Sequence, residues 1–110
     1  LQREMARRRM MEQVPKATVV VTNPTYIAIA MRYEPAENDA PIVVAKGKRV
    51  IAERIKEIAR ENNIPIVEDK PLARAMYDKV DLGQPIPVEF FTAVAEILAY
   101  VYRLKNRTAV

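Results

Sequence analysis

The chain has 110 residues, half of them hydrophobic, and a formal net charge of +4. It contains no cysteine and no histidine, which excludes disulfides, thiolate or imidazole metal sites, and a catalytic triad with a histidine base. We therefore expect no metal site and no cofactor. The length fits one compact domain with its own core, and no apolar run reaches the ~20 residues that cross a bilayer.

Residues 1–13 are good helix formers without glycine or proline, and Pro15 is expected to end this helix. Its apolar residues form a poor stripe, so we expect the helix to extend from the domain rather than pack into it. Its basic residues can contact phospholipid headgroups, nucleic acid or an acidic protein, although a solvated helix face is the commoner case. No aromatic residue is interleaved among them, so no nucleic-acid partner is expected. The cluster consists of Arg3, Arg7, Arg8 and Arg9.

Two strands are predicted next. Residues 17–21 are short and β-branched, which is typical of a strand buried on both faces. From Ile27 to Tyr33, bulky residues alternate with small or polar ones. This alternation predicts a second strand with one bulky face and one small face that a helix can approach closely.

The middle of the chain predicts a loop, a strand and a helix. Residues 34–41 form a polar loop with two prolines, and residues 42–45 form a third short strand. Lys46-Gly47-Lys48 is expected to turn out of that strand. The helix over 49–62 is amphipathic, with an inward stripe of isoleucines at 51, 55 and 58. Its exposed side is expected to carry the charge pairs Glu53 with Lys56 and Glu57 with Arg60.

The last third predicts one strand and two helices. Residues 64–67 read as a fourth strand at a sheet edge, because the proline within it cannot donate to a ladder. Asp69 is expected to cap a helix that runs to about Val80, with Leu72 and Met76 inward. The final helix, residues 88–106, carries apolar side chains on two stripes, so we expect it to be covered on more than one side.

This order of elements predicts an α/β fold: a single domain with a four-stranded mixed sheet surrounded by helices, preceded by an extended N-terminal helix. The strand–helix–strand unit over 42–67 should be parallel with a right-handed crossover. The first two strands are joined by a tight turn and should pair antiparallel.

The turn between those strands contains Asn23-Pro24, a dipeptide that can break its own peptide bond. Proline has no N–H, so the usual attack of the next backbone nitrogen on the asparagine side chain is closed. The reverse attack remains: the Asn23 side-chain nitrogen attacks its own backbone carbonyl, closes a succinimide and expels the Pro24 nitrogen. The amide is a weak nucleophile, so the fold must hold it in an attack geometry. On the dipeptide alone, an inert turn is favoured.

Other segments add context to this turn. Six of them stand out: Arg8–Met11, Val14–Ala17, Val21–Thr25, Val44–Gly47, Pro71–Tyr77 and Ala93–Tyr100. Together they closely resemble the cytoplasmic domain of the FlhB/YscU family, the switch proteins of type III secretion export gates, and its flagellar branch more than its injectisome branch. The likeness covers nearly the whole chain in the same order.

The resemblance implies a place for the chain in a larger protein. Family members have an N-terminal membrane part, joined through a helical linker that matches residues 1–16 to a cytoplasmic switch domain that matches residues 17–110. The expected location is the cytoplasmic face of the bacterial inner membrane. The expected partners are other export-apparatus proteins, secreted substrates and the domain's own cleaved fragment.

The resemblance also implies an activity. Family members cleave themselves between the Asn and Pro of an Asn-Pro-Thr-His motif, the pieces remain associated, and the apparatus changes from rod and hook substrates to filament substrates. This is a single-turnover reaction rather than that of a turnover enzyme. Carried over residue by residue, Asn23 is the cyclising residue, Pro24 becomes the new N-terminus and Thr25 belongs to the turn.

The fourth motif position departs from the family pattern, because this chain has Tyr26 where the family has histidine. A tyrosine, with a pKa of about 10, is not the proton acceptor at neutral pH that an imidazole is. If the histidine only supports the turn, cleavage survives at a lower rate, and if it is needed as a base the chain stays intact. Since the chemistry centres on Asn23, we expect cleavage. The alternative is a non-cleaving α/β protein-interaction domain whose basic helix contacts a membrane surface or nucleic acid.

Overall fold

A four-stranded sheet forms the centre of the molecule in the computed structural model, which describes residues 1–108. The last two residues of the predicted domain 17–110 lie outside the described residues. The strand order is β3-β2-β1-β4. The predicted mixed four-stranded sheet is confirmed. Its strands are β1 (Val19–Asn23), β2 (Ile27–Arg32), β3 (Ile42–Lys48) and β4 (Ile66–Glu68).

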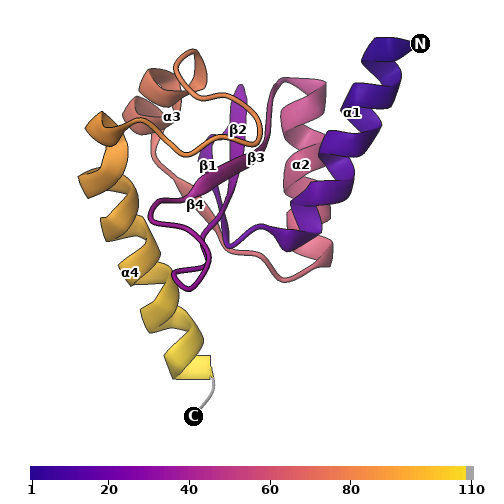
Figure 1. The fold of residues 1–110 in the computed structure, drawn as a ribbon. Coiled ribbons are helices and arrows are strands. Elements are labelled where there is room, and N and C mark those ends of the chain that lie inside the picture. The colour runs from indigo at the N-terminus through magenta and orange to yellow at the C-terminus, as the bar shows by residue number, and fades with distance from the viewer. Residues whose placement is uncertain (109–110) are drawn as a thin grey trace.

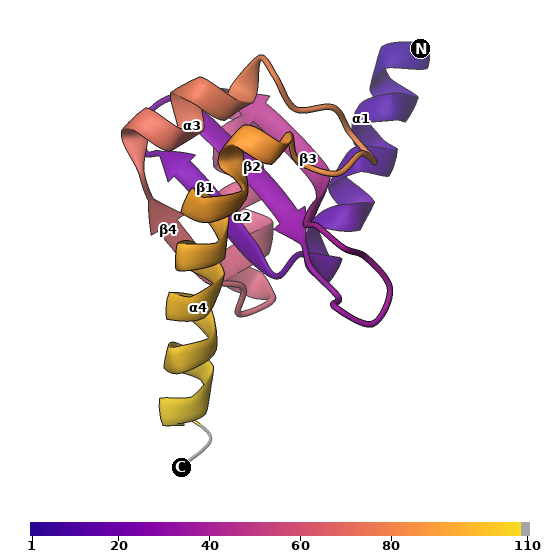
Figure 2. The same cartoon turned by 60° about the vertical axis from the view of Figure 1, so that its left-hand side comes forward.

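Helices cover both faces of this sheet (Figures 1 and 2). Two of them, α3 and α4, lie on one face, while α2 lies on the other face with α1 beside it. Within residues 1–108, no helix is both long enough and apolar enough to span a bilayer. The helices are α1 (Gln2–Gln13), α2 (Val50–Glu61), α3 (Lys70–Tyr77) and α4 (Phe91–Thr108), with short 3₁₀ helices at Val14–Lys16 and Val88–Phe90.

The central strand is β1, which pairs antiparallel with β2 and parallel with β4. All five of its residues are buried, as predicted for a strand covered on both faces. It begins two residues later than the sequence suggested and continues through Thr22 and Asn23, because these two residues pair with Ala28 and Ile27 across the hairpin. The last residue of the central strand is thus the candidate cyclising asparagine.

The small face predicted for β2 is confirmed. Ala28, Ala30 and Ala45 pack in one cluster with residues of α2, including Ile55 and Ala59. On the opposite face, bulky residues of β1, β2 and β3 pack against α3 and α4. Small side chains let a helix backbone approach the sheet closely, and this places α2 against the β1–β2 hairpin.

The third strand is longer than predicted. Lys46-Gly47-Lys48 stays in β3 instead of turning out of it, because these residues pair with β2 between Ile27 and Ile29. The Lys46 side chain also has partners on the sheet face that α3 covers. Its ammonium donates to the carbonyl oxygens of Tyr77 and Val80, both at 2.8 Å. The predicted turn at 46–48 is therefore wrong.

The crossover unit over 42–67 has the predicted parallel direction, but its two strands lie at opposite edges of the sheet. Strand β3 is antiparallel to β2, which is antiparallel to β1, and β1 is parallel to β4. Strand β4 hydrogen-bonds to β1 and lies at the edge, as predicted. The chain therefore crosses the whole sheet through α2 before it returns to β1.

The last two helices depart from the predictions in length and cover. Helix α3 is capped as expected, with Asp69 Oδ1 accepting from Leu72 N–H at 3.1 Å, but it ends at Tyr77, before the expected Val80. Helix α4 packs on the sheet through one side only. Its outer side leaves Phe91 41% and Tyr100 46% exposed, so the prediction of cover on more than one side is wrong.

The first helix projects from the domain, as predicted, because none of its residues is buried. The α-helix ends at Gln13, and Pro15 lies in the 3₁₀ helix that follows. Val14, in the same 3₁₀ helix, is fully buried and packs with the cluster that also holds Val20 and Ile64. The boundary between residues 16 and 17 stays a prediction, and Val14 anchors the projecting helix to the core.

Candidate functional site

The β1–β2 turn brings the four predicted site residues together. Tyr26 N–H donates to the Asn23 carbonyl oxygen at 2.9 Å and closes the turn. Neither Pro24 nor Thr25 has a positive φ, which excludes a type II turn and fits proline at the second position of a type I turn. Asn23 is thus both the last residue of the central strand and the first residue of the turn.

Burial changes sharply across the Asn23–Pro24 bond. Thr22 is 2% exposed and Asn23 is 6% exposed, whereas Tyr26 is 47% exposed. The asparagine side chain is therefore confined by its surroundings, while the segment after proline reaches solvent. Confinement of the amide near its own carbonyl is what the cyclisation requires.

The Asn23 carbonyl, which its own side chain would attack, already accepts a hydrogen bond from Tyr26 N–H. As this carbonyl becomes tetrahedral its oxygen gains negative charge, and a fixed N–H donor at hydrogen-bond distance stabilises that charge. The donor is a backbone group. It is present whether the side chain at this position is tyrosine or histidine.

The Tyr26 side chain lies against the start of α2. The guanidinium carbon of Arg49 is 5.5 Å from the centre of the Tyr26 ring, a cation–π contact. The backbone N–H of Arg49 also donates to the Tyr26 carbonyl oxygen at 2.9 Å. Arg49 adopts a left-handed φ of 54° as it leads into the helix. Two contacts therefore tie the end of the turn to the first residue before α2.

Lys56, on α2, contacts the turn directly. Its ammonium donates to the Pro24 carbonyl oxygen at 2.6 Å and pairs with Glu53 Oε1 at 2.7 Å. The predicted pair with Glu53 is confirmed, but Lys56 is only 7% exposed, so its predicted place on the exposed side is wrong. The sequence signal for this was that positions 52, 56 and 59 share one helical face and that Ala52 and Ala59 are core residues.

The strand side of the turn is held by a different element. Asp69 N–H donates to the Thr22 carbonyl oxygen at 2.9 Å, where β4 leads into α3. Asp69 also caps α3 with its side chain. The residues before the Asn23–Pro24 bond are thus fixed by β2, β4 and the start of α3, and the residues after it by α2.

The Lys56 ammonium at the turn is paired with the carboxylate of Glu53. The Lys56 ammonium lowers the pKa of the Glu53 carboxyl, first through its hydrogen bond and then through its charge, and Arg60 adds to this. Within residues 1–108, no group of three or more acidic side chains is placed to hold a metal ion.

The four N-terminal arginines are exposed on α1, far along the chain from the turn. Two open grooves run beside this helix. One, of about 400 Å³, lies toward α2 and includes Arg7, Arg8 and Arg54. The other, of about 790 Å³, lies toward β3 and includes Arg9 and Lys16. The structure therefore leaves the predicted basic cluster accessible.

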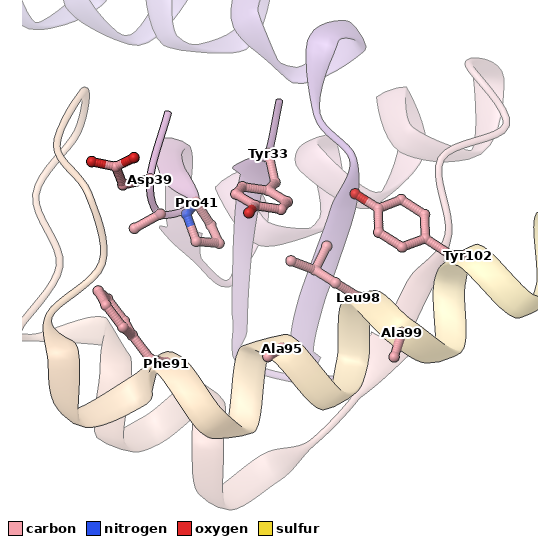
Figure 3. A pocket seen from close by; sticks show the side chains of 9 residues that line it. Tyr33, Asp39, Pro41, Phe91, Ala95, Leu98, Ala99 and Tyr102 are labelled. Carbon is pink, nitrogen blue, oxygen red and sulfur yellow. The ribbon is translucent and has the colours of Figure 1, made fainter. Parts of the chain in front are cut away.

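An apolar hollow of about 290 Å³ lies between α4 and the loop before β3 (Figure 3). Tyr102 lies at one end and Phe91 at the other, with Pro41, Tyr33 and Leu98 between them. The hollow is at the end of the β1–β2 hairpin opposite to the turn. The hollow could not be predicted from the sequence, because its lining comes from segments distant in the chain.

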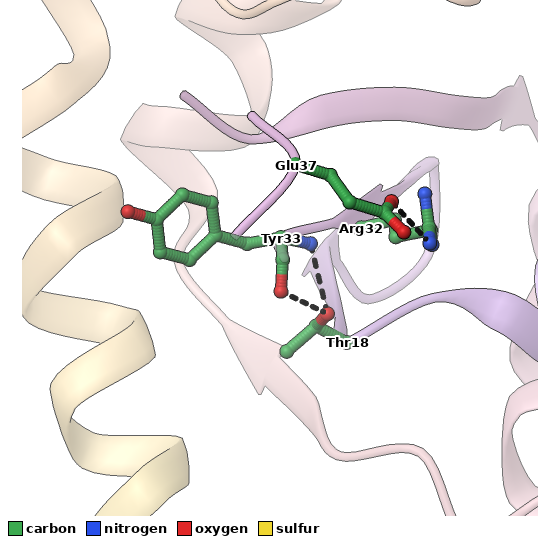
Figure 4. Close-up of polar contacts among 4 residues, drawn as sticks. All are labelled: Thr18, Arg32, Tyr33 and Glu37. Atoms are coloured by element: carbon green, nitrogen blue, oxygen red, sulfur yellow. Dashed lines mark hydrogen bonds and ion pairs between the residues drawn. The ribbon is translucent and has the colours of Figure 1, made fainter. Parts of the chain in front are cut away.

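A small polar network closes that opposite end (Figure 4). Thr18 Oγ1 accepts from Tyr33 N–H at 2.9 Å and extends the pairing of the first two strands. Arg32 binds Glu37 at 2.9 Å and holds the start of the loop over 34–41. These contacts fix the far end of the hairpin, while α2 and α3 fix the turn.

Comparison with known proteins gives a consistent match. The family model described as "FlhB HrpN YscU SpaS Family" matches residues 1–101. The flagellar biosynthetic protein FlhB of Bacillus subtilis is 55% identical over 106 residues, which are 96% of this chain and 29% of that protein. FlhB of Escherichia coli is 52% identical over 106 residues, 96% of this chain and 28% of that protein. The chain thus spans less than a third of the length of these relatives.

Solved structures agree with this match. The cytoplasmic domain of FlhB from Shewanella putrefaciens superposes with a TM-score of 0.89 and 48% identity, over 94% of this chain and 79% of that one. A mutated EscU C-terminal domain superposes with a TM-score of 0.80 and 37% identity, over 84% of this chain and 92% of that one. The predicted fold therefore agrees with that of an FlhB cytoplasmic domain.

Proposed function

Because the chain belongs to the FlhB HrpN YscU SpaS family, we propose that it is the cytoplasmic switch domain of a flagellar type III export gate and that it cuts itself once between Asn23 and Pro24. The observation that carries the cleavage is the turn itself. A buried asparagine ends the central strand, and its carbonyl oxygen is held by Tyr26 N–H at 2.9 Å.

The reaction uses only groups of the chain. Asn23 Nδ2 attacks the Asn23 backbone carbonyl carbon, and the new C–N bond closes a five-membered succinimide. The bond to the Pro24 nitrogen breaks, and that nitrogen leaves as a secondary amine after gaining the proton that the amide loses. The Tyr26 N–H stabilises the oxyanion formed on the way. The reaction happens once per molecule, so the domain is not a turnover enzyme.

The tyrosine at position 26 is compatible with this reaction. Position 26 contributes its backbone N–H at hydrogen-bond distance from the Asn23 carbonyl oxygen. Its side chain is 47% exposed and contacts Arg49. A side chain in this place supports the turn rather than accepting the amide proton. We therefore expect the Tyr26 chain to cleave itself.

The two fragments should remain together after the cut. The upstream fragment supplies β1, which lies between β2 and β4 in the middle of the sheet. Its valines at 14, 19, 20 and 21 are all fully buried, and each buried side chain of this size contributes roughly 1.5–3 kcal/mol. A central strand with such a core is retained without a covalent link.

Intact mass and denaturing electrophoresis of the purified chain test the cleavage, with Asn23→Ala as the matched control. We expect two fragments from the wild type that elute together in native size-exclusion chromatography, and one uncut chain from Asn23→Ala. A single uncut species in both samples after prolonged incubation would exclude self-cleavage for this chain. The family membership would remain.

The cellular role is tested in the longer membrane protein to which this domain belongs. As part of that protein it would lie at the cytoplasmic face of the bacterial inner membrane and contact other export-apparatus proteins and secreted substrates. Asn23→Ala in that protein should leave early, rod and hook substrates exported and reduce export of filament substrates. Equal export of both substrate classes by the Asn23→Ala protein would show that the substrate switch does not depend on self-cleavage.

The exposed arginines of α1 favour a second candidate function, contact with an anionic membrane surface. No residue of α1 is buried, and its arginines border open grooves. Each such residue near an anionic surface contributes about 1 kcal/mol. Binding to anionic vesicles should weaken when Arg7, Arg8 and Arg9 are replaced by glutamine, and unchanged binding would exclude this role.

A further inference from the structure

Three polar or charged side chains are buried among the residues that the structure describes, and all three lie at the same turn. They are Thr22, Asn23 and Lys56. Two of them belong to the hairpin, while the third comes from α2, more than thirty residues later in the chain. A buried lysine ammonium is costly unless it is paired and hydrogen-bonded. The burial of the Lys56 ammonium must therefore be offset by the groups that it contacts.

The contacts of Lys56 point at the residue after the cleavage point. The ammonium donates to the Pro24 carbonyl oxygen at 2.6 Å, and Glu53 Oε1 lies 2.7 Å away on the exposed side. Helix α2 sits close to the hairpin because alanines line that sheet face. The lysine stem can then lie along the core while its charged end reaches the turn.

We propose that Lys56 is a positioning residue for the self-cleavage, a clamp that holds Pro24 against α2. The inference rests on the proposed function and adds a residue to its machinery. Lys56 contacts the Pro24 carbonyl rather than the Asn23 carbonyl under attack, so it acts through the shape of the turn. It neither takes the amide proton nor stabilises the oxyanion.

The clamp matters because each side of the scissile bond has a separate anchor. Thr22 is held by Asp69 N–H, and Asn23 by its pairing with Ile27. On the other side, Lys56 holds Pro24 and Arg49 N–H holds Tyr26. With both sides fixed, the backbone on each side of the Asn23 carbonyl keeps one conformation, and a loose proline would let the turn leave the attack geometry.

The first test compares cleavage rates of freshly purified or refolded chains by intact mass over time. Lys56→Met keeps the stem and removes the ammonium, and we expect its cleavage to slow roughly tenfold or more, about 1.4 kcal/mol in the barrier. Lys56→Arg restores a donor and should recover much of the rate. Arg54→Met removes a positive charge from the exposed side of the same helix and is the matched control, with the rate unchanged.

A second measurement separates positioning from a loss of folding. In the uncut Asn23→Ala background, Lys56→Met should raise the hydrogen-exchange rate of the Tyr26 amide several-fold while amides at the centre of β1 keep their protection. The melting temperature of the same protein reports the fold. A general rise of exchange across the sheet would assign Lys56 to stability and overturn the proposal.

The outcomes distinguish this proposal from the function on which it rests. If the wild type is cut and Lys56→Met is cut equally fast, the clamp is wrong and the self-cleavage stands. If the wild type stays uncut beside Asn23→Ala, self-cleavage is wrong and Lys56 has no reaction to position. Unchanged exchange at Tyr26 in Lys56→Met would overturn the clamp without reference to cleavage.

Discussion

On β2 and β3, the sheet face toward α2 carries alanines and a glycine, with Val20 of β1 beside them, whereas the face toward α3 and α4 is lined by valines, isoleucines and a methionine. On the first face α2 packs on the small side chains of β2 and β3, and on the second α3 and α4 pack on large side chains. Close approach allows a lysine of α2 to reach a backbone carbonyl at the turn. The packing of one face therefore sets the geometry of the candidate site.

The two faces should respond oppositely to changes in side-chain size. The bulky face holds its helices through volume, so truncation should be costly there. The alanines and glycine of the small face have little side-chain volume to lose, so that face should instead be destabilised when they are enlarged. All stability measurements below use Asn23→Ala, because a cut chain does not unfold as one molecule.

The largest expected effect is truncation on the bulky face. Ile29 is fully buried within the cluster between the sheet and α3/α4. Ile29→Ala should lower the free energy of unfolding by about 2–5 kcal/mol, through lost burial and the cavity left behind. Denaturant unfolding measures this. Val50→Ala, at a site that is 81% exposed on α2, is the control and should change stability by less than ~0.5 kcal/mol.

The next effect is enlargement on the small face at Gly47. A Cβ at this position would overlap Ile51 Cγ2 and lie 2.7 Å from Ile51 Cβ. Gly47→Ala should therefore cost about 1–3 kcal/mol of unfolding free energy. Ile51→Ala should recover part of that cost in a double-mutant cycle, because the two side chains compete for one space.

Gly83 provides the matched control for that cycle. It has a φ of 78° and nothing within 4 Å of a Cβ, so Gly83→Ala is unfavourable only through its backbone conformation. Ile51→Ala should leave its cost unchanged. Equal recovery at both glycines would mean that Gly47 is not limited by its contact with α2.

The contrast between the faces was visible in the sequence for β2 and less so elsewhere. Alternation of alanines with bulky residues from 27 to 33 predicted the small face and the helix upon it. Glycine between two lysines is typical of loops, so the sequence favours a turn at residues 46–48. In the structure, pairing with β2 keeps them in the strand, a tertiary contact that local propensity does not encode.

The candidate site likewise has a part that the sequence predicts and a part that it does not. The turn could be predicted because its four residues, 23–26, are contiguous and lie between two predicted strands. Lys56 was harder to place, because a lysine three residues after a glutamate is also the pattern of an exposed helix face, and only the small residues at 52 and 59 on the same face indicate burial. Its burial depends on how far α2 stands from the hairpin. That distance is set by residues of three different strands.

A smaller effect is expected at the anchor on the strand side of the turn. Asp69→Ala removes the side-chain cap of α3 and should lower the free energy of unfolding by about 0.5–2 kcal/mol. The backbone N–H of residue 69 remains and still donates to the Thr22 carbonyl oxygen. In a chain that keeps Asn23, Asp69→Ala should therefore change the cleavage rate little. Asp69→Asn keeps a capping oxygen and should restore stability. A cleavage defect as large as that of Lys56→Met would show that both anchors depend on side chains.

The smallest effect is the pH dependence that Glu53 adds through its contact with Lys56. Its hydrogen bond to the ammonium, the charge of Lys56 and the charge of Arg60 hold the Glu53 pKa below its usual value of 4.5. The folded state therefore binds fewer protons than the unfolded chain around this pH, so the contribution is present above about pH 4.5 and is lost as pH falls through the lowered pKa. Glu53→Gln should lower the melting temperature slightly at pH 7 and by less as the pH falls through the lowered pKa, and the exposed Glu12→Gln on α1 is the charge-deletion control. A melting difference that is the same at every pH would show that the carboxylate does not act through its charge on Lys56.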